Sequence, residues 1–130
     1  MKSRKGLVRE CDKAFSDLVR ERDGWRCVLC GEKDRDLLDA GHFLDRGHFA
    51  TRWSEMNVHC QCKSCNNLHR YDKWPYTEWM LNKYGQKRID ELHRIYNTVT
   101  KISNPTLIEW TKDFRAKRAE LLLQKAAVWN

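Results

Sequence analysis

The stretch NVHCQCKSCN (residues 57–66) decides the fold that this sequence predicts. Its first half alternates apolar and polar side chains, which is typical of a β-strand. Its second half contains Cys62 and Cys65, which are spaced as in a metal-binding knuckle. A second Cys-x-x-Cys pair begins upstream at Cys27, and residues 31–61 separate the two pairs. The predicted strand therefore runs directly into one half of a four-cysteine site.

The two pairs, Cys27 with Cys30 and Cys62 with Cys65, are expected to hold one structural zinc ion, because tetrahedral Zn²⁺ takes four thiolates. Disulfides and a redox dithiol are the alternatives. The basic start carries no apolar signal segment, so we expect a reducing compartment, the cytoplasm. Such a zinc contributes on the order of 10–16 kcal/mol, which is comparable with the whole stability of an ordinary domain.

The length and composition favour one small domain with a thin core. The chain has 130 residues, of which 33% are charged and 41% hydrophobic, and no apolar run is long enough to span a bilayer. A membrane or secreted protein is therefore not expected. Lys and Arg number 25 against 18 Asp and Glu, and the resulting net charge of +7 weakly favours a polyanionic partner. The two remaining cysteines, Cys11 and Cys60, are expected to be small buried thiols.

The hydrophobic pattern predicts a single α+β domain over residues 1–130. It comprises an N-terminal helix (10–22), a zinc-stapled strand–strand–helix core (27–72) and a helical C-terminal part (75–127). Within the core, strands are expected at 37–44 and 56–62 and a helix at 63–72. Residues 1–8 are expected to be a frayed arm. Residues 45–55 are expected to be a basic and aromatic loop, from which Trp53 could wedge into DNA.

The segment between the knuckles concentrates groups suited to phosphodiester hydrolysis. This chemistry needs a base to activate water and a cation to stabilise the leaving oxygen. A histidine is a natural base at neutral pH, and an Asn or Asp oxygen suits Mg²⁺. Candidates in and just after the segment are His42, His48, Asn57, His59, Asn66 and His69. A purely structural, hydrogen-bonded role remains the alternative for each histidine.

The order His42, Asn57, Asn66 between two knuckles resembles the ββα-metal (HNH) nuclease motif in its His-Asn-Asn form. More closely, three strings are similar to the phage NinG/Rap-like recombination endonucleases: Asp39-Ala-Gly-His42-Phe, Arg46-x-His48 with Thr51-Arg52, and Asn57-Val-His59-x-Gln61-Cys62-x-x-Cys65-Asn66. The similarity continues into the terminal helices and covers most of the chain.

This resemblance implies a role for each matching residue. His42 corresponds to the general base, Asn57 to the residue that braces the two strands, and Asn66 to the ligand of a catalytic Mg²⁺ or Mn²⁺. One position departs from many relatives, which carry an Asp ligand immediately before the base, where this sequence has Gly41. Asp39 is the nearest available carboxylate and is a candidate second ligand.

DNA contacts are expected from basic and imidazole side chains around this site: Arg46, His48, Arg52, His59, His69 and Arg70. The sequence and its resemblance together indicate a metal-dependent DNA endonuclease. The resemblance further implies that it acts on branched recombination intermediates, such as D-loops or Holliday junctions, in the cytoplasm of a bacterial host cell. A homodimer and other recombination proteins are further candidate partners. Two alternatives stay open: an HNH enzyme of nicking, homing or restriction type, and a non-catalytic zinc-dependent DNA-binding module.

Overall fold

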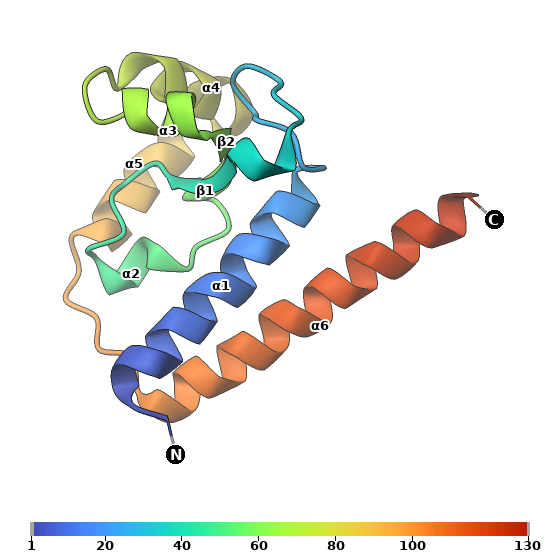
Figure 1. Ribbon diagram of the computed structural model, residues 1–130. Helices are drawn as coiled ribbons and strands as arrows, with labels where there is room; N and C mark the ends of the chain where they lie inside the picture. The colour runs from blue at the N-terminus through green and yellow to red at the C-terminus, as the bar shows by residue number, and fades with distance from the viewer. Residues whose placement is uncertain (1, 130) are drawn as a thin grey trace.

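The computed structural model describes residues 2–129 and contains a small sheet surrounded by helices (Figure 1). Its helices are α1 (Arg4–Arg22), α2 (Phe49–Arg52), α3 (Lys63–Leu68), α4 (Trp74–Tyr84), α5 (Gln86–Tyr96) and α6 (Asn104–Trp129). Its strands are β1 (Leu38–His42) and β2 (Val58–Cys62), and a 3-10 turn, Arg35–Leu37, leads into β1. The predicted α+β class is confirmed.

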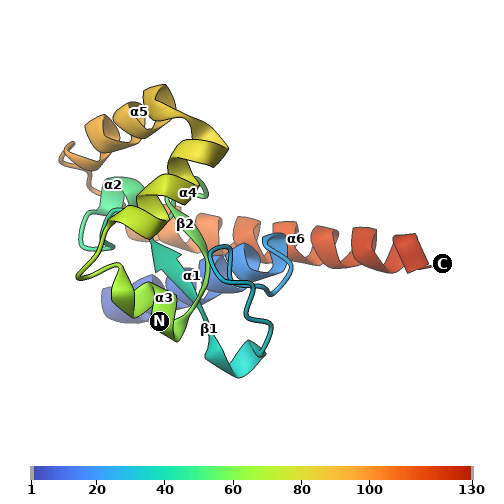
Figure 2. The ribbon, with the colours of Figure 1, turned by 90° about the horizontal axis from the view of Figure 1, so that it is seen from above.

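The two strands form an antiparallel pair, with Leu38 opposite Cys62 and His42 opposite Val58. Both predicted strands are found, and both are shorter than expected. The helix α3 begins directly after β2, so that strand, strand and helix lie together at one end of the molecule (Figure 2). The Cys62 side chain caps this helix by accepting from the Cys65 amide at 3.4 Å. The helix predicted over 63–72 ends at Leu68.

The strand β2 is buried over its whole length, although its sequence alternates apolar and polar residues. One face packs on α1, and on the other face His59 lies against the rings of Tyr76 and Trp79 from α4. Both faces of β2 are therefore covered, and its alternating sequence does not mark one buried face and one solvent-exposed face. This arrangement buries polar side chains, and each of them needs a partner.

The N-terminal arm differs from its prediction. Residues expected to fray belong to α1, which begins at Arg4 after Ser3 accepts a hydrogen bond from the Gly6 amide at 3.1 Å. A Ser at this position satisfies one of the free amides of a helix start. Leu7 is buried against α6, so the added turns are stabilised by packing.

Three small apolar clusters replace a single large core. The first lies between α1 and the first half of α6 and includes Phe15, Val19 and Leu107. The second joins α4 and α5 through Tyr76 and Met80. The third surrounds the cysteine pairs. Because none of the clusters is large, a metal that ties the third one together would matter for stability.

Residues 45–55 were predicted to form a loop, and the structure differs here too. It contains α2, and Trp53 is buried in the first cluster with its Nε1 donating to Asp12 Oδ1 at 3.0 Å. A buried indole cannot insert between bases, so the proposed DNA wedge is wrong. The side chain instead fixes the segment to α1.

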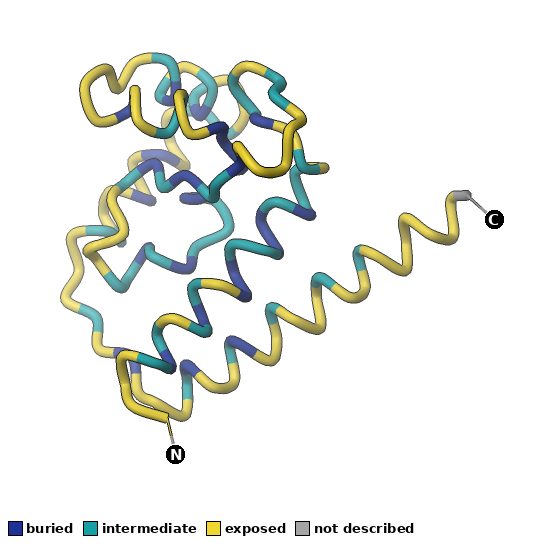
Figure 3. The backbone as a smooth tube through the Cα atoms, in the orientation of Figure 1, coloured by how far each residue is buried: buried dark blue, intermediate teal, exposed yellow. Residues whose placement is uncertain are grey.

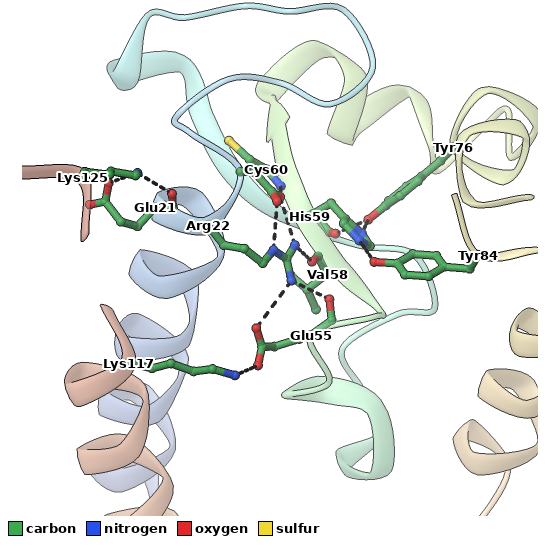
Figure 4. A network of polar contacts seen from close by, with 12 residues as sticks. Glu21, Arg22, Glu55, Val58, His59, Cys60, Tyr76, Tyr84, Lys117 and Lys125 are labelled. Carbon is green, nitrogen blue, oxygen red and sulfur yellow. Dashed lines mark hydrogen bonds and ion pairs between the residues drawn. The ribbon is translucent and has the colours of Figure 1, made fainter. Parts of the chain in front are cut away.

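The second half of α6 continues past the body, and most of its residues are exposed (Figure 3). Two of its lysines form ion pairs within the chain, Lys117 with Glu55 and Lys125 with Glu21 (Figure 4). Part of the basic surface of this helix is therefore neutralised. None of the described helices is both long and apolar enough to cross a membrane.

Candidate functional site

A cavity of about 800 Å³ opens beside β1, between α1 and α3. Six residues singled out in the sequence line it: Asp39, His42, Arg46, Asn66, His69 and Arg70. The fold thus gathers the candidate base, both candidate cation ligands and part of the candidate DNA surface. The other four, His48, Arg52, Asn57 and His59, lie outside its wall.

The imidazole of His42 is held at the end of β1. Its Nε2 lies 2.9 Å from the backbone carbonyl oxygen of Arg52. Because a carbonyl oxygen only accepts, Nε2 carries the ring proton and Nδ1 keeps a free lone pair. Burial lowers the pKa of His42, although the Arg52 carbonyl and Asp12 oppose the shift. The ring is therefore neutral at neutral pH, as a general base must be.

The side chain of Asn57 braces the segment between the strands. Its Oδ1 accepts from the Leu44 amide at 2.8 Å, and its Nδ2 donates to the carbonyls of Leu44 and Thr51 at 2.9 and 3.1 Å. Asn57 is fully buried, so these bonds face little competition from water. They fix the segment that presents the Arg52 carbonyl to His42.

The residue before His42, Gly41, leaves a space that two amide side chains fill. A Cβ at Gly41 would lie 1.8 Å from Gln61 Oε1 and 3.0 Å from Asn66 Oδ1. No side chain fits there while both amides hold these positions. Where many relatives have a carboxylate, this protein thus has a glycine and the amide oxygens of two other residues.

Asp39 lies two residues before Gly41 and on the same face of the sheet, because alternate residues of a strand point to the same side. Its carboxylate is 3.1 Å from Lys63 Nζ and is partly exposed to the cavity. This pair is held by an exposed lysine, so the carboxylate can exchange Lys63 for another cation at little cost.

The imidazole of His69 is almost buried at the end of α3, with Nε2 at 2.8 Å from the Phe43 carbonyl oxygen. Its Nδ1 is buried and has no hydrogen-bond partner in the part of the chain that the structure describes. Burial lowers the pKa of His69, so the ring is neutral and cannot supply the positive charge expected of a phosphate contact. His69 is therefore an uncharged residue in the lining of the cavity, and its Nδ1 can accept a hydrogen bond.

The sulfur atoms of Cys27, Cys30, Cys62 and Cys65 all lie within 4.8 Å of one another. In the first pair, the Gly31 amide donates to the Cys27 carbonyl at 2.9 Å, and Gly31 has a φ of +83°, which suits a glycine. The four cysteines are positioned to bind one metal ion, and thiolate chemistry favours zinc. As expected, Cys11 and Cys60 are fully buried and are not among the four candidate ligands, although Cys60 packs in the same apolar cluster as Cys27 and Cys62.

Two side chains that were predicted to contact DNA have partners within the protein. The Arg52 guanidinium bonds to both oxygens of Asp12, at 3.0 Å from Nε and 2.6 Å from Nη2, and its side chain is only 12% exposed. It acts within the protein and not as a free phosphate ligand. The exposed ring of His48 stacks on Tyr96, with centroids 3.8 Å apart.

His59 is only 1% exposed and cannot contact DNA, which corrects its prediction. It lies between the hydroxyl groups of Tyr76 and Tyr84, at 2.9 Å from Nδ1 and 2.7 Å from Nε2 (Figure 4). Burial, with Arg22 nearby, lowers the pKa of His59 to about 3. The ring is therefore a neutral link between β2 and α4.

The exposed cations around the cavity are Arg46, Lys63, Arg70 and Lys73. Sequence reasoning found the two arginines and missed the lysines. It also missed Asp12 and Gln61. Asp12 lies on an amphipathic helix, and the sequence around it gives no sign of the residues that it contacts. Gln61 lies within the motif at residues 57–66, but the resemblance assigned it no role.

Comparison with known proteins supports a phage origin. A family described as "Bacteriophage Lambda NinG protein" matches residues 1–124. The chain is 30% identical over 99 residues to "Protein ninG" of Escherichia phage 933W, which covers 75% of this chain and 49% of that protein. The corresponding protein of Escherichia phage lambda is 29% identical over 99 residues, with 75% and 48% covered.

The "Protein ninG" of Salmonella phage P22 is 27% identical over 128 residues, which covers 92% of this chain and 63% of that protein. The chain spans about half the length of the phage 933W and lambda relatives. No solved structure matches it.

Proposed function

Because this chain belongs to the NinG family of bacteriophage proteins, we propose that it takes part in phage recombination as a metal-dependent DNA endonuclease of HNH type. The order β1, β2, α3 and the residues His42, Asn57 and Asn66 support this type of nuclease. The single observation that carries the proposal is the neutral His42 ring, held by the Arg52 carbonyl in a cavity that Asn66 also lines.

The proposed mechanism assigns one task to each group. His42 Nδ1 takes a proton from the attacking water, while Nε2 stays bonded to the Arg52 carbonyl. Asn57 keeps that carbonyl in place through its bonds to Leu44 and Thr51. Asn66, with Asp39 nearby, would hold Mg²⁺ or Mn²⁺, which supplies charge stabilisation at the leaving oxygen.

The substrate proposed is branched DNA, such as a D-loop or a Holliday junction, as the resemblance to recombination nucleases implies. Exposed Arg46, Arg70 and Lys73 around the cavity would contact phosphates on either side of the scissile bond. The four cysteines would hold the zinc that ties this end of the fold together. A non-catalytic zinc-dependent DNA-binding module is the second candidate, favoured by the missing carboxylate at Gly41.

Cleavage of a labelled four-way junction and of a matched linear duplex separates these candidates. The zinc-loaded protein is tested with Mg²⁺ and with no added cation, because a chelator would also remove zinc. Cutting of the junction that needs Mg²⁺ supports the proposal. Sequence-selective cutting of the linear duplex would favour a nicking or restriction type, and binding without cutting would favour the non-catalytic module.

A further inference from the structure

The side chain of Gln61 is buried in β2 and has no hydrogen-bond partner among residues 2–129. It has no exposed surface, and neither Oε1 nor Nε2 forms a hydrogen bond with any of the described residues. A buried polar group left without a partner costs about 1–3 kcal/mol, and native proteins seldom leave both ends of an amide unpaired. The position is therefore expected to have a partner other than protein.

The surroundings of this amide indicate what kind of partner it takes. Gln61 Oε1 lies against Gly41, where Asn66 Oδ1 also points, since a Cβ on Gly41 would meet the two oxygens at 1.8 and 3.0 Å. Asp39 is paired directly with Gln61 across the sheet and shares this face. Two amide oxygens thus meet beside the residue that precedes His42, while the carboxylate on the same face is paired with Lys63.

We propose that Gln61 Oε1 is a ligand of the divalent cation, together with Asn66 Oδ1, in place of a carboxylate at Gly41. Hard cations such as Mg²⁺ and Mn²⁺ prefer oxygen ligands and accept neutral amides. With Oε1 on the cation, Nε2 is free to donate to one of its waters or to a phosphate oxygen. The catalytic use of this cation rests on the proposed function, whereas its binding does not.

This assignment explains why Gly41 is a glycine. A side chain at that position would displace the Gln61 amide, so the ligand comes from the neighbouring strand. Two neutral ligands attract a cation less than a carboxylate would. The site is therefore expected to bind Mn²⁺ weakly in the free protein and more tightly when Asp39 leaves Lys63 to join it.

The test is a titration of the zinc-loaded protein with Mn²⁺, in which free Mn²⁺ is measured by electron paramagnetic resonance. Gln61→Met keeps the length of the side chain and removes the oxygen. We expect its Mn²⁺ affinity to fall at least about tenfold, as is usual when a group at a metal site is lost. Gln61→Glu should bind Mn²⁺ more tightly than the parent. Gln124→Met, on the exposed part of α6, is the matched control and should bind as the parent does.

A measurement on the parent protein covers the case in which Gln61→Met does not fold. Mn²⁺ broadens nearby NMR signals, so the side-chain amide signals of Gln61 and Asn66 should disappear before that of Gln124. Equal Mn²⁺ binding by folded Gln61→Met, or an undisturbed Gln61 amide signal, would overturn the inference. Cutting assays are read separately: cleavage with no effect of Gln61 on Mn²⁺ affinity refutes only the ligand, and Mn²⁺ bound at Gln61 without any cleavage refutes only the nuclease.

Discussion

The Nε2 atom of His42 lies 2.9 Å from the backbone carbonyl oxygen of Arg52, and the side chain of Arg52 is bonded to Asp12 on α1. The proposed base is thus oriented by the backbone of one residue whose guanidinium anchors the same segment to a helix. Asn57 fixes that segment from the other side. A single short segment therefore links the N-terminal helix to the chemistry of the cavity.

Arg52→Ala is expected to affect stability more than DNA affinity. Loss of its charged hydrogen bonds to Asp12 should lower the free energy of unfolding by about 1–3 kcal/mol, measured by urea denaturation. Arg46→Ala is the contrast, because its exposed guanidinium lies at the rim of the cavity. That variant should keep its stability and reduce the log–log salt slope of duplex binding by about 0.9. The reverse pattern would show that Arg52 is the phosphate contact.

Cys62→Ser should leave the protein unfolded or aggregated, because a structural zinc contributes as much as the total stability of a small domain. Circular dichroism and zinc content measure this outcome. Cys11→Ala is the control, since Cys11 is buried away from the cluster and should cost only a small cavity. A Cys62→Ser protein that folds normally without metal would refute the zinc site.

Acid should destabilise the protein through His59. The native pKa of this ring is about 3, whereas in the unfolded chain it is near 6.5, as for a free imidazole. Its contribution to stability is complete above the unfolded value and is lost as pH falls, by up to about 1.4 kcal/mol per pH unit. Burial shifts the pKa values of His42 and His69 in the same direction.

His59→Phe removes this titration and the bonds to two tyrosine hydroxyls. The variant should be less stable at pH 8 but lose less stability between pH 7 and 5, measured by thermal denaturation. If His59→Phe lost as much stability as the parent between pH 7 and 5, the acid sensitivity of the protein would not come from His59.

Asn66→Ala should abolish cutting by weakening the hold on the cation, and high Mn²⁺ should restore part of the rate. The same rescue should fail for a variant that lacks the base. Asp39→Ala decides the role of the carboxylate that Lys63 now holds. A loss that Mn²⁺ rescues makes Asp39 a cation ligand, and near-normal cutting makes it a partner of Lys63 alone.

The four-cysteine site and the order of elements could be predicted because their signals are local. Cysteine spacing identified the cluster without further information, and an alternating pattern ending at Cys62 located β2. The start of α1 was missed because its first turns are held by Leu7 packing on α6, a contact between opposite ends of the chain. Local sequence carries no sign of such a contact.

The motif residues of the candidate site could be named from the sequence, but the side chains that hold them in place could not. Arg52 and His59 were taken as DNA contacts because charge and imidazole suggest phosphate, yet Asp12 and two tyrosines hold them inside the fold. Gln61 carried no role because an amide in a strand is unremarkable until its partners are known. Only the three-dimensional structure places its amide, without a partner, beside Gly41.

The central claim is that His42 activates water for DNA hydrolysis, and the rate at which His42→Ala cuts a labelled four-way junction in Mg²⁺ tests it most directly. The variant should keep its fold, its zinc and its affinity for the junction, each measured on the same preparation. Its single-turnover rate should fall by a factor on the order of 10²–10⁴, the usual contribution of a positioned base. Cutting at the parental rate by nuclease-free His42→Ala protein would contradict the account.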